Sequence, residues 1–302
     1  MKFRAHDTFY IRKGWLDKGM KYIKSKPNLF IDKDENPMDV LGIGSNMVKA
    51  LRYWLQAVGV TQELNCSGKR LQTFTPIGTY VFKYDRYIEE LGTLHLLQYK
   101  LATNKDEATA WYYFFNEFNM NQFTKEDFIR GLENYIKMID SDLSVAYRSL
   151  SDDFICIMNT YLAKYKLYAQ KYSPENNLEC PLSELGLIDF VNKDKKIYKK
   201  VVPSAKSFNP WVIMAIIADN ANGAIEISLN ELLFGKCNIG KVFNLDAVTM
   251  LDILYKIEQY GELKIIRTAG LDVVQLTQTK PFEYYIEKYY SSIESIEDLK
   301  NG

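Results

Sequence analysis

Apolar and polar residues follow a helical spacing in most of the first eighty positions. This spacing predicts helices over residues 14–26, 37–41 and 46–58. Ser45 is a suitable N-cap for the third helix, and Gly59 follows its last apolar position. Shorter apolar runs predict a strand over 29–32 and a hairpin with strands 71–75 and 78–82 on either side of Pro76. Helix, strand, helix, helix and hairpin is the order of a winged helix, which we therefore expect for residues 1–82.

The middle of the chain, residues 83–175, keeps the helical spacing. Thr124 and Ser151 precede two of its periodic stretches and are predicted N-caps. A polar segment over 173–177 interrupts the pattern. We expect a helical middle domain with helices over 85–91, 93–102, 107–118, 125–139 and 152–172.

The last segment, residues 176–302, comprises a linker and a second, clearer winged-helix pattern. Ser228 and Asp246 are predicted N-caps, and Gly261 is predicted to close the longest helix of the pattern. The expected elements are a helix over 210–220, a strand over 225–228, helices over 229–234 and 247–260, and strands over 263–267 and 273–278. The sequence thus predicts a mainly α fold with small β-hairpins, in which winged-helix-like N- and C-terminal domains flank a helical middle domain.

Composition narrows the function classes. The 302 residues include 38 Lys and Arg against 38 Asp and Glu, which excludes a uniformly basic coat but not a local basic patch. The longest apolar run, 211–218, is shorter than the roughly 20 residues of a membrane span, and the first residues lack the apolar core of a signal peptide. We therefore expect a cytoplasmic protein without a membrane partner. The four cysteines form no C-x-x-C pair, so no zinc finger is predicted.

The helix over 46–58 is the first candidate for DNA contact, because the second helix of a helix-turn-helix enters the major groove. Its polar positions, with the residue before them, supply the candidate contacts Ser45, Asn46, Lys49, Arg52 and Tyr53. Backbone contact is favoured over base reading, since Arg52 is the single arginine of this helix. In the alternative interpretation, Lys49 and Arg52 only solvate an exposed face and Ser45 is only a cap.

The segment 6–15 brings titratable and cationic side chains together. His6 could act as a general base or metal ligand, Asp7 could hold Mg²⁺ or Mn²⁺, and Arg12 could neutralise charge on a cleaved phosphodiester. The structural alternative is a turn or cap in which Arg12 pairs with Asp7. Phosphate binding by Arg12 and Lys13 is favoured over catalysis. A further basic pair, Lys69 and Arg70, is a candidate for the same role.

Other conspicuous groups have structural interpretations. His95 lies among leucines and is expected in the core, and the aromatic run 111–115 is expected in the core or at a dimer face, which makes a homodimer one candidate assembly. The acidic turn 32–36 is typical of a solvated loop. The basic stretch 193–200 is expected as a surface loop, with phosphate contact as a secondary role. Protein contact and DNA contact are equally expected for the C-terminal domain.

Several runs of sequence resemble the DUF4007 family. They occur in order along the chain, over 6–9, 12–15, 41–55, 92–101 and 108–118, followed by VFNLD and AGLD near the end. The resemblance implies a bacterial protein associated with DNA phosphorothioate modification and its defence systems. One branch of the family, the B component of Ssp-type systems, is regarded as a DNA-nicking protein. This chain lacks an obvious acidic-Lys or H-N-H nuclease signature.

The combined prediction is a DNA-binding component of a phosphorothioate modification or defence system that engages DNA mainly through the backbone. Sulfur-transfer and ATPase proteins of that system are the implied partners. One alternative is a metal-dependent nickase in which His6, Asp7 and Arg12 surround the scissile phosphate with Mg²⁺ or Mn²⁺. The other is a non-enzymatic interaction scaffold or regulator.

Overall fold

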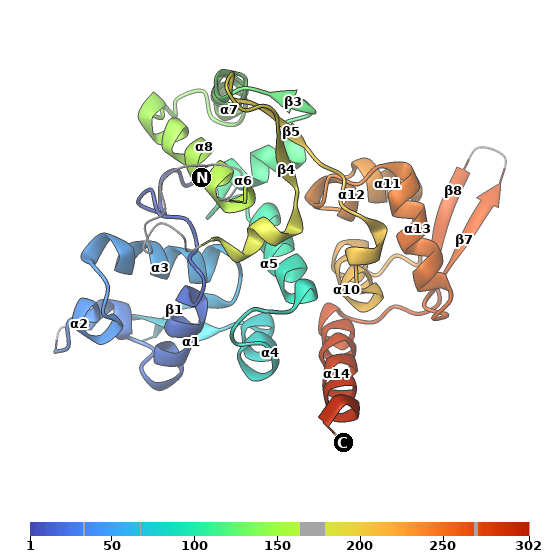
Figure 1. Cartoon of the computed structure of the whole chain (residues 1–302), viewed down its shortest axis with the longest axis horizontal. Helices are drawn as coiled ribbons and strands as arrows, with labels where there is room; N and C mark the ends of the chain where they lie inside the picture. Colours follow the sequence, from blue (N-terminus) through green and yellow to red (C-terminus); the bar gives the residue numbers. More distant parts are fainter. Residues whose placement is uncertain (33, 67, 164–178, 269–270, 302) are drawn as a thin grey trace.

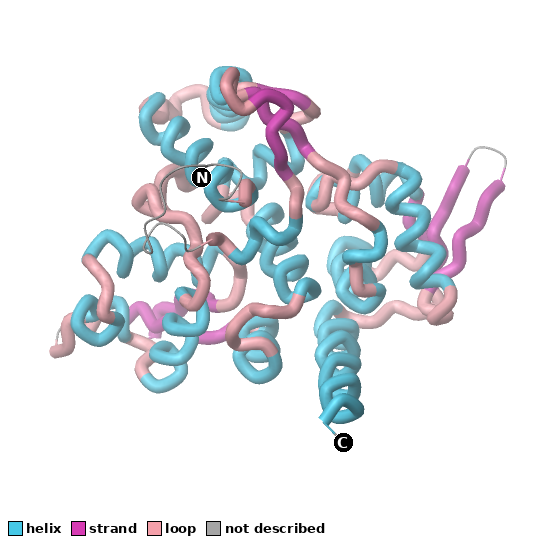
Figure 2. The backbone as a smooth tube through the Cα atoms, in the orientation of Figure 1, coloured by secondary structure: helices cyan, strands magenta, loops and turns pink. Residues whose placement is uncertain are grey.

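The computed structural model describes residues 1–32, 34–66, 68–163, 179–268 and 271–301. Three groups of elements succeed one another along the chain, coloured blue, teal to green, and yellow to red in Figure 1. Helices dominate, and the strands form small antiparallel sheets (Figure 2). The predicted mainly α class with small hairpins is therefore confirmed. None of the described helices combines the length and apolarity that crossing a bilayer requires.

The N-terminal group is organised by the packing of helix α1 on helix α3. Trp15, Met20 and Ile23 lie on one face of α1 and are buried, as their spacing predicts. Gly19 permits the close approach of α3, because a Cβ at this position would lie 2.6 Å from Leu55 Cδ1. The elements are α1 (Trp15–Ser25), η1 (Leu29–Ile31), α2 (Pro37–Leu41), α3 (Ser45–Ala57), β1 (Thr61–Cys66), β2 (Lys69–Phe74) and α4 (Pro76–Tyr84).

The predicted N-terminal hairpin is wrong in position. Strands β1 and β2 pair antiparallel, from Thr61 opposite Phe74 to Cys66 opposite Lys69. Residues 76–84, expected to contain the second strand, form helix α4 instead. Proline is well tolerated in the first turn of a helix, and the Thr75 side chain accepts a hydrogen bond from the N–H of Gly78. Helix α4 also runs through the domain boundary expected at residue 82.

Two further N-terminal predictions are wrong. Residues 29–31 form the 3₁₀ turn η1 instead of a strand. Ser45 is the first residue of α3 and not its cap, because Gly44 occupies the cap position and no side chain hydrogen-bonds to it.

The middle group surrounds helix α5, which is buried on nearly all sides. It also contains a short π-helical stretch, η2, that continues α6. Helix α7 has the predicted bounds, and Thr124 caps it in a reciprocal capping box with Asp127. The elements are α5 (Leu91–Thr103), α6 (Thr109–Tyr112), η2 (Tyr113–Glu117), β3 (Gln122–Phe123), α7 (Lys125–Ile139) and α8 (Tyr147–Tyr161).

Some predictions for the middle group are corrected. Ser151 lies inside α8, whose cap position is Ala146. The helix expected over 85–91 is replaced by a turn in which the Asp85 carboxylate accepts the N–H groups of Glu89 and Glu90. The end of the predicted helix over 152–172 and the polar segment 173–177 lie outside the described residues.

The C-terminal group contains the elements predicted for it, with the caps Ser228 and Asp246 both accepting a backbone N–H from the third helical residue. Its sheet has the order β6-β8-β7. The elements are η4 (Pro181–Leu185), β4 (Ile188–Asn192), β5 (Ile197–Lys200), η5 (Ala205–Ser207), α10 (Pro210–Ala221), β6 (Glu226–Ser228), α11 (Leu229–Phe234), α12 (Ile239–Val242), α13 (Ala247–Glu258), β7 (Leu263–Thr268), β8 (Leu271–Leu276) and α14 (Phe282–Asn301).

Two contacts join parts of the chain that are far apart in sequence. The basic stretch 193–200, expected as a loop, completes the β4–β5 hairpin, and β5 also pairs with β3 of the middle group. Helix α14, which no sequence pattern predicted, packs on α10 and on α4. There the ring of Tyr290 stacks on those of Tyr80 and Tyr84, with centroids 6.1 and 5.4 Å away.

A buried hydrogen-bonded pair joins the N-terminal segment to α8. The His6 ring is fully buried, and its Nε2 lies 2.7 Å from Asp153 Oδ1. Because His6 Nδ1 accepts the N–H of Thr8, the ring proton lies on Nε2, which donates it to Asp153. The backbone N–H of Arg4 donates to the same carboxylate oxygen. Burial raises the pKa of Asp153, and the hydrogen bond from His6 opposes this rise.

We expect Asp153→Ala to lower the free energy of unfolding by about 3 kcal/mol, because His6 and the N–H of Arg4 lose their acceptor inside the core. Urea unfolding measures the change. Asp252→Ala, which removes an exposed carboxylate of α13, should change stability by less than about 0.5 kcal/mol. Equal effects of the two substitutions would contradict a structural role for the pair.

His95 should make stability depend on pH. It is stacked on Phe208, and burial lowers its pKa from 6.5 to about 3. The unfolded chain takes up a proton on this residue below pH 6.5 and the folded chain does not, so stability is complete above pH 6.5 and falls as the pH drops towards 3. The fall should approach about 1.4 kcal/mol per pH unit.

Urea unfolding of the wild-type chain and of His95→Leu between pH 7 and pH 5 separates this contribution from the titration of carboxylates. The variant should lack the part of the fall that begins near pH 6.5. Identical pH dependence in both chains would contradict the assignment.

Candidate nucleic-acid interface

The N-terminus of α3 is open to solvent and has no side-chain cap. Gly42 adopts the left-handed conformation (φ 61°) at the end of α2, and Gly44 leads into α3 without a capping side chain. The backbone N–H groups of the first helical turn have no partner within the helix, and they carry the positive end of its dipole. Ser45, Asn46 and Lys49 are exposed around this end. This arrangement suits a phosphate group.

Arg52 and Tyr53, predicted from the same helix, have partners within the protein. Arg52 Nε lies 2.5 Å from Glu63 Oε1 on β1, and Gln56 donates to the same oxygen. The Tyr53 ring is buried against Trp54, with centroids 5.0 Å apart. These contacts fix α3 on the hairpin and leave three of the five predicted side chains available for DNA.

Arg12 and Lys13 lie before the first turn of α1. The Arg12 guanidinium is placed over the rings of Phe9 and Trp15, at 5.7 and 5.4 Å from their centroids, and Lys13 is exposed. Within the described residues no ion pair joins Arg12 to Asp7, which the structural alternative required. Arg12 is half-buried by this stacking, and the planar face of a guanidinium can lie on a ring while its N–H groups point outward in the ring's plane.

His6 and Asp7 are differently placed. His6 is closed to solvent and both of its ring nitrogens are hydrogen-bonded, so it has no free atom for a substrate proton or a metal. Asp7 is half-buried in a turn with φ 50°, and its N–H donates to the Arg4 carbonyl. Within the parts of the chain that the structure describes, no group of three or more His, Cys, Asp or Glu side chains is arranged to hold a metal ion.

Lys69 and Arg70 lie at the start of β2, beside the tip of the hairpin. Lys69 pairs through its backbone with Cys66, and Arg70 pairs with Asn65. The Arg70 side chain is exposed. The structure thus brings Lys69 and Arg70 together at the hairpin tip, while the open N-terminus of α3 forms a separate set.

A groove of about 700 Å³ between α1, β2 and α4 contains cations that the sequence did not single out. Lys24 Nζ and the Arg86 guanidinium lie over the Phe82 ring, at 4.8 and 5.3 Å from its centroid. Arg86 is also bonded to Asp17. The sequence did not reveal this grouping, because α1 and α4 lie far apart along the chain.

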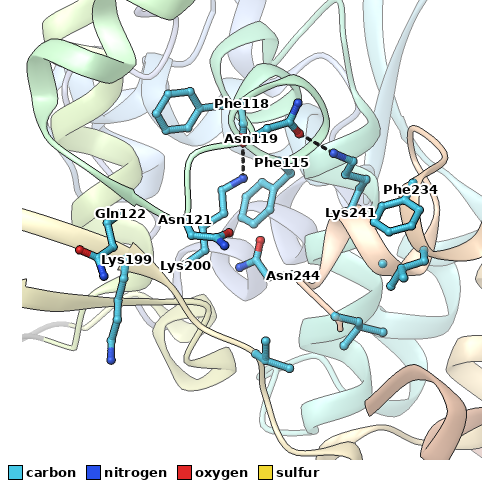
Figure 3. A pocket seen from close by; sticks show the side chains of 14 residues that line it. Phe115, Phe118, Asn119, Asn121, Gln122, Lys199, Lys200, Phe234, Lys241 and Asn244 are labelled. Atoms are coloured by element: carbon cyan, nitrogen blue, oxygen red, sulfur yellow. Dashed lines mark hydrogen bonds between the residues drawn. The ribbon is translucent and has the colours of Figure 1, made fainter. Parts of the chain in front are cut away.

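A second hollow, of about 650 Å³, lies between the middle and C-terminal groups (Figure 3). Its walls come from the segment 115–122, from β5 and the residues after it, and from α11, α12 and the residues that follow. Three lysines line it, Lys199, Lys200 and Lys241, together with the amides of Asn119, Asn121, Gln122 and Asn244. We call this hollow the lysine–amide cleft.

Lys200 holds one wall of the cleft in place. Its Nζ donates to the carbonyl oxygens of Phe114 and Phe118, both at 2.7 Å, at the end of the π-helical stretch. Burial lowers the pKa of Lys200 to about 7, and nearby Lys241 acts in the same direction. Sequence alternation could have shown that Lys200 and Tyr198 lie on the buried face of a strand, but the charge pattern suggested a loop.

The sequence was compared with models of known protein families and with curated proteins. The family model described as "Protein of unknown function (DUF4007)" matches residues 3–290. A comparison with curated proteins gave no match.

Two solved structures are similar to the chain throughout its length. One is described as "Magnesium ion-bound SspB crystal structure" and the other as "SspB crystal structure"; their TM-scores are 0.82 and 0.81. Both are 26% identical, and both alignments cover 97% of this chain and 89% of the other chain. The matched family model, which spans nearly all of the residues, shows that this chain belongs to the DUF4007 family.

Proposed function

We propose that this protein is a DNA-binding component of a bacterial DNA phosphorothioate modification or defence system. Its similarity to SspB over 97% of the chain supports membership of such a system, and sulfur-transfer and ATPase proteins are the partners that this role implies. The contact with DNA is made mainly to the phosphate backbone.

The observation that carries the DNA contact is the open N-terminus of α3. Its uncapped N–H groups and the exposed Asn46 and Lys49 offer donors and positive charge at one point, where a phosphate would be bound. The element order of the N- and C-terminal groups supports a winged-helix interpretation of both, with α3 as the recognition helix of the first. Exposed Lys13 provides a further basic contact.

Backbone contact is preferred over base reading because the arginine of α3 is already engaged. Arg52 is bonded to Glu63, and a bidentate contact with guanine would require breaking that ion pair. Lys49 carries a point charge, which suits a phosphate oxygen. The expected binding is therefore weakly specific and sensitive to salt.

The proposal contains no cleavage step. The predicted base, His6, is buried with both nitrogens occupied. His6 is therefore not assigned the role of general base.

The double substitution Lys13→Glu with Lys49→Glu should weaken binding to a duplex oligonucleotide at least tenfold at low salt. If each lysine contacts one phosphate, the slope of log affinity against log salt should fall by about 2, since each contact releases about 0.9 counterions. Fluorescence anisotropy over a salt series measures both quantities. The control is Lys137→Glu at an exposed position of α7, which changes the charge by as much as each of the two substitutions does and should leave duplex affinity unchanged. Unchanged duplex affinity and slope in the double variant would sink the assignment.

A further inference from the structure

The lysine–amide cleft has the size and the charge of a ligand site. Its volume of about 650 Å³ lies within the range of about 300–1,000 Å³ that small-molecule sites occupy. Three lysines and no carboxylate are among its described lining residues. Lys236, outside the lining, is neutralised by Glu117 at 2.8 Å. The net charge of the lining therefore favours an anionic ligand.

The lysines of the cleft are not equivalent. Lys200 donates hydrogen bonds to two backbone carbonyl oxygens and so orders the segment that carries Asn119 and Asn121. Lys241 Nζ lies 2.6 Å from Asn119 Oδ1, and an ammonium group has two further donors. Lys199 is exposed. Lys241 is thus the cation that an anion inside the cleft would meet, whereas Lys199 lies at the edge and points away from Lys241 (Figure 3), and Lys200 is a positioning residue.

The amides supply both kinds of hydrogen-bonding group. Asn119 accepts from Lys241 through Oδ1, which leaves its amino group for a ligand. Asn244 donates through Nδ2 to the Leu187 carbonyl, which leaves its Oδ1 as an acceptor. Asn121 and Gln122 are exposed at the edge. The lining thus offers both donors and acceptors, and the edge of a nucleobase presents groups that pair with both kinds.

Phe234 adds a flat apolar surface to this polar lining. Its side chain is 63% exposed, which is unusual for a phenylalanine, and it lies beside Lys241 at the cleft (Figure 3). Exposed aromatic rings next to cations are the platforms on which single-stranded nucleic acids stack their bases. A base within a duplex has both faces covered and could not use this ring.

We propose that the lysine–amide cleft binds one nucleotide of unpaired DNA, with its phosphate on Lys241, its base between Phe234 and the amides, and the neighbouring phosphate of the strand on Lys199 at the edge. This site rests on the proposed role in DNA binding, but it uses different residues from the duplex contact of α3. A free nucleoside monophosphate has the same chemistry as a nucleotide within a strand. The test therefore includes both.

The experiment measures anisotropy of a fluorescein-labelled twelve-nucleotide oligothymidylate with the full chain. Phe234→Ala should weaken binding about tenfold through the loss of stacking. Lys199→Gln with Lys241→Gln should weaken it by a similar factor and reduce the salt slope by about 1.4, at about 0.7 for each single-strand phosphate. Matched controls are Tyr147→Ala, an exposed aromatic residue of α8, and Lys195→Gln on the β4–β5 turn. Both controls should bind as the unsubstituted chain does.

Two comparisons separate this proposal from the duplex contact. The cleft variants should bind duplex DNA within twofold of the unsubstituted chain. When Phe234→Ala is added to the Lys13→Glu, Lys49→Glu variant, it should still weaken binding to the single-stranded oligonucleotide. Competition by free thymidine monophosphate would identify the isolated nucleotide as a ligand, and competition only by oligonucleotides would assign the site to strands; either result supports the site.

Single-strand affinity within twofold of the original in both cleft variants would overturn the proposal. Equal losses for single-stranded and duplex DNA would also overturn it, because they would indicate general electrostatic attraction. Lys199 and Phe234 are exposed, so Lys199→Gln and Phe234→Ala, each tested alone, keep the test valid if substitution of Lys241 impairs folding.

Discussion

The hydrogen bond from His6 to Asp153 fixes how the N-terminal group meets the middle helices. Its atoms lie in a core formed by Trp54 of α3 and Trp111 of α6, whose rings are 5.3 Å apart. A carboxylate in such surroundings depends on the donors that reach it, and His6 and the N–H of Arg4 both donate to its Oδ1. The N-terminal segment is thus anchored to α8, and Trp54 donates to the Phe9 carbonyl beside the same core.

Lys200 performs a comparable role at the other end of the middle group. Its ammonium group joins β5 to the carbonyl oxygens at the end of the π-helical stretch, in a site that lowers its pKa to about 7. The His6–Asp153 contact and the Lys200 contact both place a hydrogen-bonded polar group inside apolar surroundings. There, a misplaced partner would leave the group unpaired and would lower stability. They fix the relative positions of the surfaces proposed to bind DNA, the open end of α3 and the lysine–amide cleft.

The elements that sequence predicted correctly depend on local interactions. Helix α7 has its predicted bounds because Thr124 and Asp127 cap each other within four residues of chain. Asp246 and Ser228 act in the same local way. The displaced hairpin shows the limit of this reasoning, because Pro76 is compatible with both a turn and the first turn of a helix. The pairing of β1 with β2 and the capping by Thr75 decided between them. Helix α14 was missed because its aromatic residues are explained only by their contacts with α4 and α10.

The sequence by itself determined the mainly helical class, the family resemblance and several exposed cations, including Lys13 and Lys49. It could not determine which charged residues are free of ion pairs. Arg52 and Lys49 lie three positions apart on one helix, but only Arg52 is hydrogen-bonded to Glu63 of β1. Likewise, His6 carries no sign of burial in its sequence neighbourhood. The tertiary structure alone assigned His6 to the core and gathered Lys199, Lys241 and Phe234 around one cleft. Charge and periodicity are properties of local sequence, whereas burial and ion pairing depend on residues brought together from distant parts of the chain.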